Sequence, residues 1–270
     1  MGTAAQINSQ FEALQSFLTV AILLMARFGA FVATVPFLGQ LIPSGLVRTC
    51  VVAAFALPVF PYVHWQYLEI APTLTNSGIM LLVLKEAVIG IVLAIVLGAF
   101  TFGLMAAGFF LDFQRGAGMA EVIAPGSGEQ TSTTSVLLLH MYITILFSTG
   151  GFLTVLGLMY SSYQVWGVFE TLPELSGDFV AHSLHLLDDI MKVLLVLFAP
   201  IVIVLFLVEL TLAVYSRFNT QLNVTIVAMP IKSGLMFIIL LLMMPFVVRY
   251  MTESVAFFPD LFNRLKEVFQ

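Results

Sequence analysis

The sequence predicts an all-α, polytopic membrane-type protein with about six long apolar helices. Hydrophobic residues make up 60% of the 270 residues and charged residues only 9%, against roughly 25% charged residues in an average soluble domain. This amount of polar surface is too small to cover a water-soluble globule of this size. Much of the protein surface is therefore expected to face lipid or partner subunits. The net charge of −5 is spread along the chain, and no basic run indicates a nucleic-acid partner.

Six apolar segments predict the helices. Most of them approach the roughly 20 residues that cross a bilayer core as a helix. They are apolar on all sides, without the alternation of apolar and polar residues that is typical of strands. We expect some of the helices to be kinked or broken and to pack as helical hairpins. The segments run over residues 17–38, 47–63, 78–108, 136–160, 193–215 and 224–248.

The first three segments carry features of their own. No basic residue precedes Arg27, so the first segment lacks the positive region of a cleaved signal peptide and is expected to be retained. The second segment is short, and Pro58 and Pro61 interrupt its end. The third contains small residues at four-residue spacing, which let helix backbones approach closely: Gly90, Ala94 and Gly98, then Ala99, Gly103 and Ala107.

The later segments differ in their connections. A Gly/Ser/Thr-rich stretch over 112–135 precedes the fourth segment, and a second long connection runs over 164–190. Within that connection, residues 179–191 alternate apolar and polar residues at helical spacing, which predicts an amphipathic helix. The sixth segment contains Pro230 and Pro245, where kinks or breaks are expected.

Charged residues occur inside the apolar segments. A charge at the centre of a bilayer costs roughly 3 kcal/mol, so such residues are expected to face a bundle interior, an aqueous path or an opposite charge. Lys85 and Glu86 are adjacent and point roughly 100° apart on a helix, so they are not expected to pair well with each other, and each is expected to find its own partner elsewhere. Pairing between subunits or a hydrophilic conduit is one interpretation, and ion pairs within the chain are the other. The residues are Arg27, Lys85, Glu86, Glu209 and Lys232.

The sequence contains no catalytic motif. HExxH, Walker A and GxSxG patterns are missing, which predicts a protein that is not an enzyme and binds no cofactor. His182, His185 and Asp189 could share a helix face and bind a metal ion, but a solvated polar face is the expected interpretation, so no metal site is predicted. Cys50 is the single cysteine and is expected to be a small packing residue.

Five blocks of residues follow one another along nearly the whole chain: "RFGAFVATVPFLGQLIPSGLVR", "KEAVIG", "GFFLDFQRG", "LFSTGG" and "RFNTQLNVTIVAMPIKS". In this order they resemble the FliR/SctT family of export-gate proteins of type III secretion systems. The form "MPIKS" is similar to the virulence-type branch more than to the flagellar branch. Two positions depart from the family pattern: Thr220 stands where relatives often have proline, and Ala124 precedes Pro125 where relatives commonly have an Asp-Pro pair.

The resemblance implies a structural and gating subunit of the export gate, forming part of the pore through which unfolded substrate proteins cross the bacterial inner membrane. The implied partners are the P/R-type and Q/S-type gate subunits in a hetero-oligomer, the U-type switch protein, the large export-gate protein and membrane lipid. The assembly would lie at the centre of the secretion basal body, raised toward the periplasm. A single domain over 1–270 is implied, with a P/R-like part over 1–190 and a Q/S-like helical hairpin and tail over 191–270.

The resemblance also implies a plug, formed by the loop over 113–132, that blocks the pore at rest. Glycines would give the loop its mobility and apolar residues its seal, while Asp112 and Arg115 would anchor its base at i, i+3. An ordinary connecting loop is the alternative. The expected plug residues are Phe113, Gly116, Gly118, Met119, Val122, Ile123, Pro125, Gly126 and Gly128.

A second set of residues is expected to serve as buried charges or to hold the assembly. Polar groups in an apolar setting need partners, so Gln221, Asn223 and Lys232 are expected to bond to a neighbouring Q/S-type subunit. The full set is Arg27, Arg48, Lys85, Glu86, Asp112, Arg115, Glu209, Arg217, Gln221, Asn223 and Lys232.

A small-solute secondary transporter is the alternative function. In that interpretation, helix breaks near Pro58, Pro230 and Pro245 would form a binding site, and Glu86 and Glu209 would bind a substrate and a proton or cation. A transporter should be stable alone, whereas a gate subunit should be unstable alone and be rescued by its partners.

Overall fold

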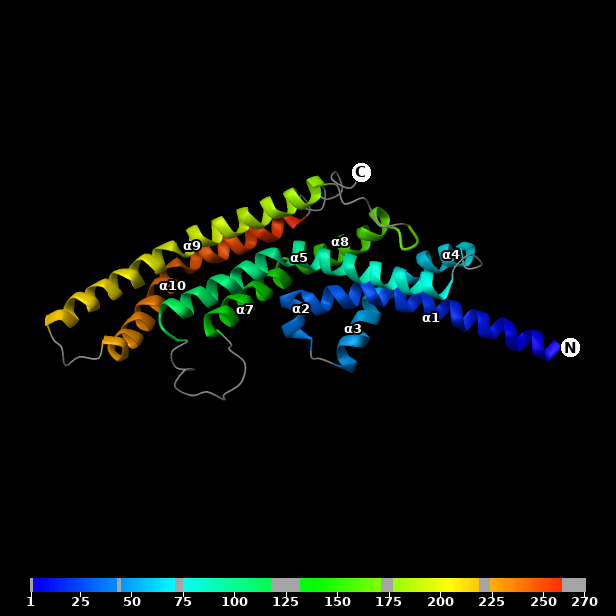
Figure 1. Cartoon of the computed structure of the whole chain (residues 1–270), viewed down its shortest axis with the longest axis horizontal. Coiled ribbons are helices and arrows are strands. Elements are labelled where there is room, and N and C mark those ends of the chain that lie inside the picture. Colours follow the sequence, from blue (N-terminus) through cyan, green and yellow to red (C-terminus); the bar gives the residue numbers. More distant parts are fainter. Residues whose placement is uncertain are drawn as a thin grey trace. The chain divides into compact units, whose positions relative to one another are not determined.

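The computed structural model is helical, which confirms the predicted fold class. It describes residues 2–42, 45–70, 75–117, 132–170, 177–218 and 224–258, and none of these residues forms a strand (Figure 1). Four of the described helices are long and apolar enough to cross a membrane, and two bent helix pairs raise that number to six. The helices are α1 (Gly2–Thr34), α2 (Pro36–Leu41), α3 (Leu46–Ala56), α4 (Phe60–Ile70), α5 (Asn76–Gln114), α7 (Thr133–Ser148), α8 (Gly151–Val165), α9 (Gly177–Phe218) and α10 (Val224–Ala256).

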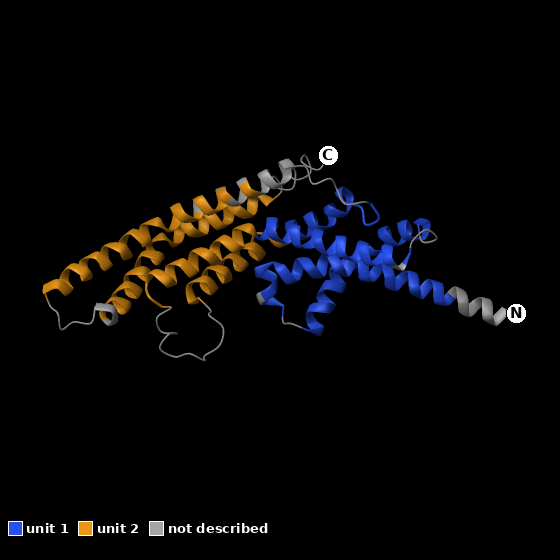
Figure 2. Ribbon diagram, in the orientation of Figure 1, with its two compact units in different colours: residues 1–98, 153–180, 259–270 blue, residues 99–152, 181–258 orange. Residues whose placement is uncertain are grey.

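Two compact units make up the chain (Figure 2). Unit 1 contains the described parts of Met1–Gly98 and Leu153–Val180, and unit 2 contains the described parts of Ala99–Phe152 and Ala181–Phe258. Each unit has its own apolar core. Fully or almost fully buried side chains include Leu23, Phe28, Phe31, Val63 and Leu93 in unit 1 and Leu104, Leu138, Leu146, Leu205 and Leu240 in unit 2.

The first apolar segment forms a longer helix than expected, since α1 begins at Gly2 and not near residue 17. Its end is set by Pro36. A residue before proline is disfavoured in the helical region, and Val35 is extended, with φ −69° and ψ 122°. Pro36 then starts α2, where its missing N–H would have no partner in any case.

Two apolar segments are broken into bent pairs. The helices α3 and α4 meet at 75° around Pro58, where an interruption was predicted. The break between α7 and α8, at 78°, was not predicted. It occurs because Gly150 takes a left-handed backbone conformation, with φ 74°, directly after Thr149 closes the last turn of α7.

The last two helices are more continuous than expected. The predicted amphipathic segment over 179–191 and the apolar segment after it belong to one helix, α9. The helix α10 runs through Pro230 and Pro245, so neither proline breaks it, and the kinks expected there remain a prediction. Each proline still removes one N–H from the helix ladder and leaves the carbonyl four residues earlier without its usual donor.

Three glycines of α5 admit other helices at close range. A Cβ at Gly90 would overlap the backbone carbonyl of Arg27 in α1, and a Cβ at Gly108 would overlap backbone atoms of Ser135 in α7. At Gly103 the neighbour is the Leu194 side chain of α9. The small residues of this segment therefore serve packing within the chain.

Candidate functional site

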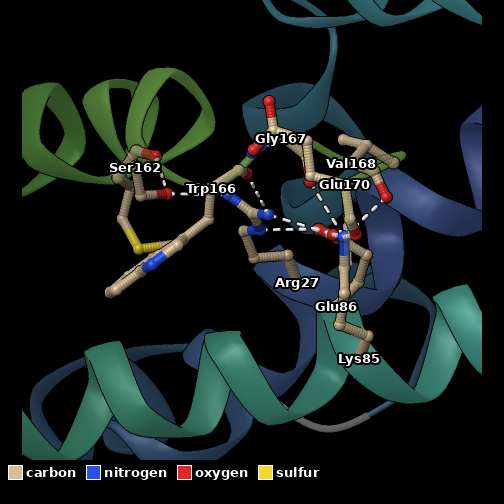
Figure 3. Close-up of polar contacts among 9 residues, drawn as sticks. Arg27, Lys85, Glu86, Ser162, Trp166, Gly167, Val168 and Glu170 are labelled. Atoms are coloured by element: carbon tan, nitrogen blue, oxygen red, sulfur yellow. Dashed lines mark hydrogen bonds and ion pairs between the residues drawn. The ribbon is translucent and has the colours of Figure 1, made fainter. Parts of the chain in front are cut away.

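Three buried charged residues lie together in unit 1 and are called here the unit 1 charge cluster: Arg27 of α1 and Lys85 and Glu86 of α5 (Figure 3). The Arg27 Nε donates to Glu86 Oε2 at 2.6 Å, and its Nη2 donates to Glu86 Oε1 at 3.0 Å. Both side chains are fully buried. Two parallel, charge-assisted bonds of this kind fix the relative position of two helices more firmly than a single contact does.

The remaining donors of Arg27 reach the end of α8. Its Nη1 donates to Ser162 Oγ at 3.0 Å, and its Nη2 donates to the Trp166 carbonyl at 2.9 Å (Figure 3). The guanidinium also lies 3.9 Å from the centre of the Tyr163 ring, where the π-face attracts a cation. One side chain thus joins α1, α5 and α8.

Backbone oxygens surround the Lys85 ammonium. It donates to the carbonyls of Gly167 at 2.8 Å, Val168 at 2.6 Å and Glu170 at 3.1 Å (Figure 3). It also lies 3.3 Å from Glu86 Oε1, so the expectation that these adjacent residues do not pair was wrong. Their Cα–Cβ bonds diverge, but the flexible four-carbon stem of lysine lets the ammonium bend back to the carboxylate. Each residue also has a separate partner, as the sequence predicted.

The carboxylate of Asp112 joins two helix ends in unit 2. Its Oδ2 accepts bonds from Ser132 Oγ at 2.6 Å and from the Thr134 N–H at 3.0 Å. Its Oδ1 accepts bonds from Arg115 Nε at 2.9 Å and from Thr134 Oγ1. Ser132 in turn caps α7 by accepting the Ser135 N–H at 3.0 Å. This loop-base cluster (Asp112, Arg115, Ser132 and Thr134) ties the end of α5 to the start of α7.

Only part of the expected plug falls on described residues. The Phe113 side chain is 77% exposed. Gly116 has a φ of 85°, which is left-handed backbone, and it faces the Met229 side chain of α10. The other expected plug residues lie outside the described residues: Gly118, Met119, Val122, Ile123, Pro125, Gly126 and Gly128.

Lys232 links three helices of unit 2. Its buried ammonium donates to Glu209 Oε2 at 3.0 Å and to the Gln114 carbonyl at 3.2 Å. The second contact places a cation at the C-terminal end of α5, where the helix dipole favours it. Lys232 was expected to bond to a neighbouring subunit, but these two partners lie in the same chain. Its ammonium reaches them because α9 and the end of α5 both pack beside α10.

The remaining assembly residues have less defined surroundings. Arg48 is half-buried in α3, and its Nε finds no hydrogen-bond partner among the described residues. Arg217 is exposed in the last turn of α9. Gln221 and Asn223 lie outside the described residues.

The carboxylates required by the transporter interpretation are already engaged. Glu86 is paired with two cations, and Glu209 is paired with Lys232. Within the described part of the chain, no three His, Cys, Asp or Glu side chains are grouped to hold a metal ion. The side chains of His182, His185 and Asp189 are not among those described. A solute or cation at the fully buried Glu86 would have to displace a bound lysine or arginine.

Comparison with known proteins gives a consistent result. The sequence profile of bacterial export proteins, family 1, matches residues 18–257. The "Yop proteins translocation protein T" of Yersinia pestis is 39% identical over 222 residues, 82% of this chain and 84% of the relative. The "Surface presentation of antigens protein SpaR" of Salmonella typhimurium is 31% identical over 218 residues, 80% of each chain. The "Flagellar biosynthetic protein FliR" of Bacillus subtilis is 30% identical over 240 residues, 88% of this chain and 89% of the relative.

Proposed function

The chain belongs to family 1 of the bacterial export proteins, and from this premise we propose that it is a structural and gating subunit of a type III export gate. As a member of this family, the chain is a multi-span membrane protein of the bacterial export apparatus, and the family is not a family of enzymes. Its identity of 39% to the Yersinia protein, against 30% to the Bacillus flagellar protein, agrees with the predicted virulence-type branch.

The length of α5 carries this proposal. The candidate span Ser77–Gln114 has 38 residues, which extend about 57 Å along a helix axis at about 1.5 Å per residue. The hydrocarbon core of a bilayer is about 30 Å thick. A helix of this length would need a tilt of about 58° to stay inside the core, beyond the range of roughly 0–40° that membrane helices adopt.

The exposed side chains of α5 remain apolar over this whole length. Lipid cannot cover all of them at an ordinary tilt, so protein partners cover the rest. We assign this cover to P/R-type and Q/S-type subunits in a hetero-oligomer at the centre of the basal body, in the inner membrane and raised toward the periplasm, with the U-type and large export-gate proteins beside it. The exposed residues include Met80, Leu81, Leu84, Val88, Ile91, Ile95, Phe102, Phe109, Phe110 and Phe113.

A second surface is suited to an aqueous conduit. On α7 the exposed polar residues Thr133, His140 and Thr144 are spaced i, i+7 and i+11 on one helix face, which also carries the exposed Leu137. The Thr144 hydroxyl donates to the His140 carbonyl at 2.8 Å, and His140 Nδ1 lies 2.8 Å from the Val136 carbonyl. Side chains of this kind are hydrogen-bonded to their own helix and carry no fixed charge. They can therefore face water without binding a passing polypeptide through an ion pair.

Gating belongs to the plug loop over 113–132 in this proposal. The loop-base cluster supports it, because a carboxylate with four donors holds both flanking helix ends together. In this proposal the loop would move out of the pore while α5 and α7 stay joined. The same proposal keeps a single domain over 1–270, with a P/R-like part over 1–190 and a Q/S-like hairpin and tail over 191–270.

Co-expression tests the proposed function. The tagged chain is produced with and without neighbouring P/R-type and Q/S-type proteins, and the purified material is weighed by native mass spectrometry. We expect a stable hetero-oligomer with the partners and poor recovery without them. A well-behaved monomer or homodimer that ignores both partners would refute the proposal and favour the transporter.

A further inference from the structure

The partners of Arg27 are synthesised long after Arg27 itself. Glu86 follows it by 59 residues, Ser162 by 135 and the Trp166 carbonyl by 139. At roughly 5–20 residues per second, the last of these partners is made about 7–28 s after Arg27. The helix α1 therefore meets the membrane with a guanidinium that has none of its final partners.

The helix α1 is the least apolar of the four long candidate spans among the described residues. Its candidate span, Gln10–Thr34, has a mean hydropathy of 2.0, against 2.7, 3.1 and 2.3 for the other three long spans among the described residues. Arg27 lies inside this span. No lysine or arginine occurs among residues 1–26, so these residues supply none of the positive charges that normally orient a span.

The helix α5 supplies what α1 lacks. Its Glu86 takes both Arg27 bonds, at 2.6 and 3.0 Å. One helical turn later, Gly90 lets the Arg27 backbone carbonyl approach at a distance that a Cβ would prevent. Glu86 and Gly90 are spaced i, i+4 and so share one face of α5. One face of α5 therefore gives α1 both a counter-charge for Arg27, from Glu86, and a close backbone contact, at Gly90.

We propose that the Arg27–Glu86 pair directs membrane insertion: as long as α1 carries the charge of Arg27, it adopts its one stable transmembrane orientation only when α5 delivers Glu86, and the two helices integrate as a neutral pair. At that stage the positive charge of Lys85 is not yet neutralised. It is satisfied later, when the carbonyls of Gly167, Val168 and Glu170 arrive. The order of integration is thus α1 with α5, followed by the end of α8. This inference concerns insertion and stands without the proposed gate function.

Cysteine labelling of the full-length chain tests this order. The single cysteine, Cys50, is exposed, so it is first removed by Cys50→Ser, and Gln10→Cys then places one thiol at the start of the α1 span. A membrane-impermeant maleimide is applied to spheroplasts and, separately, to inverted membrane vesicles. The parent chain should be labelled from one side only. Adding Glu86→Gln should raise labelling from the other side at least roughly tenfold, because Arg27 is then unpaired.

A double variant and a matched control complete the experiment. Arg27→Met together with Glu86→Gln removes both charges, so labelling should return to one side. Glu209→Gln removes another ion-paired carboxylate from an apolar helix and should leave the orientation of α1 unchanged. One-sided labelling of the Glu86→Gln chain would overturn the inference, and so would two-sided labelling that persists in the double variant. Neither result depends on whether the chain assembles into a gate.

Discussion

At the scale of single residues, buried charges in this chain are satisfied by several partner atoms and not by one opposite charge. The Lys85 ammonium has three carbonyls and a carboxylate, and the Asp112 carboxylate has four donors. An apolar environment holds no water to bond a donor or acceptor that lacks a protein partner, so every such group costs free energy. A simple ion pair would leave several such atoms unsatisfied.

The loop-base cluster yields a prediction at this scale. Asp112→Asn keeps the shape of the side chain but removes its charge, and a charge-assisted hydrogen bond contributes about 1.5–3 kcal/mol. We expect the assembled complex in proteoliposomes to leak small ions more than the parent complex does. Deletion of Gly116 to Gly128 sets the upper limit of the leak, which is measured with an ion-sensitive dye.

Glu253→Gln is the control for Asp112→Asn, because it breaks an exposed pair with Arg249 and should leave the leak at the parent level. Unchanged leakage after the deletion would contradict the plug. Leakage after the deletion but not after Asp112→Asn would show that the loop seals the pore without help from its base.

Sequence patterns located the buried charges but not their full surroundings. Arg27, Lys85 and Glu86 stand out because they interrupt apolar segments. The carbonyls that hold Lys85 could not be predicted, since every residue has a carbonyl and none marks itself as a ligand. Ser132 was missed although a signal existed: a serine directly before an apolar run is typical of a helix N-cap.

At the scale of helices, glycine positions decide which neighbours α5 accepts. Gly90 and Gly108 face the backbone of α1 and α7, whereas Gly103 faces the end of a leucine side chain in α9. A backbone cannot move aside without shifting a whole helix, but a side-chain end can rotate. The three sites should therefore respond differently to the same added methyl group.

Gly90→Ala and Gly103→Ala form a matched pair of variants on one helix. Alanine stabilises a helix by about 0.5–1 kcal/mol relative to glycine, while overpacking costs about 1–3 kcal/mol. We expect Gly90→Ala to lower the melting temperature of the purified complex and Gly103→Ala to leave it nearly unchanged. Equal melting temperatures for the two variants would mean that α1 does not approach α5 as closely as the structure has it.

Helix breaks were only partly predictable from sequence. Pro58 marked the bend between α3 and α4 correctly. Gly150 alone does not predict the bend after α7, because glycine permits a left-handed conformation but does not require it. Pro245 does not break α10, which runs through it. Whether a proline breaks a helix depends on packing against other segments, which local sequence does not contain.

At the scale of the whole molecule, composition and the apolar segments predicted the fold class and the approximate number of spans, but not the apolar length of α5, which exceeds the thickness of a bilayer core. That length is 38 residues in its candidate span. The sequence showed a segment over 78–108, shorter at both ends. The extra turns come from polar and aromatic residues near the ends, which extend a helix once their backbone groups are paired.

Surface substitutions on α5 test whether protein covers this helix. Ile91→Ser with Ile95→Ser changes side chains that are 41% and 49% exposed, so the fold of the chain itself should tolerate it. We expect co-purification of the partner subunits to fall by roughly tenfold or more, because an interface core tolerates polar substitution poorly.

Ile89→Ser on the same helix is the contrasting variant. Ile89 is 5% exposed, so its replacement should lower the thermal stability of the chain and thereby all assembly. Full recovery of the partners with the Ile91/Ile95 double variant would instead indicate that lipid covers this part of α5.

The three glycine contacts of α5 also have a genetic consequence. A bulkier Gly103→Val change, which is too large for rotation of one side chain to accommodate, could be suppressed by a second-site change that shortens Leu194, because the obstacle is a side chain. No side-chain truncation can relieve Gly108→Ala, since its obstacle is the backbone of Ser135. Selection for restored secretion should thus return intragenic suppressors at position 194 for the first lesion and only true revertants for the second.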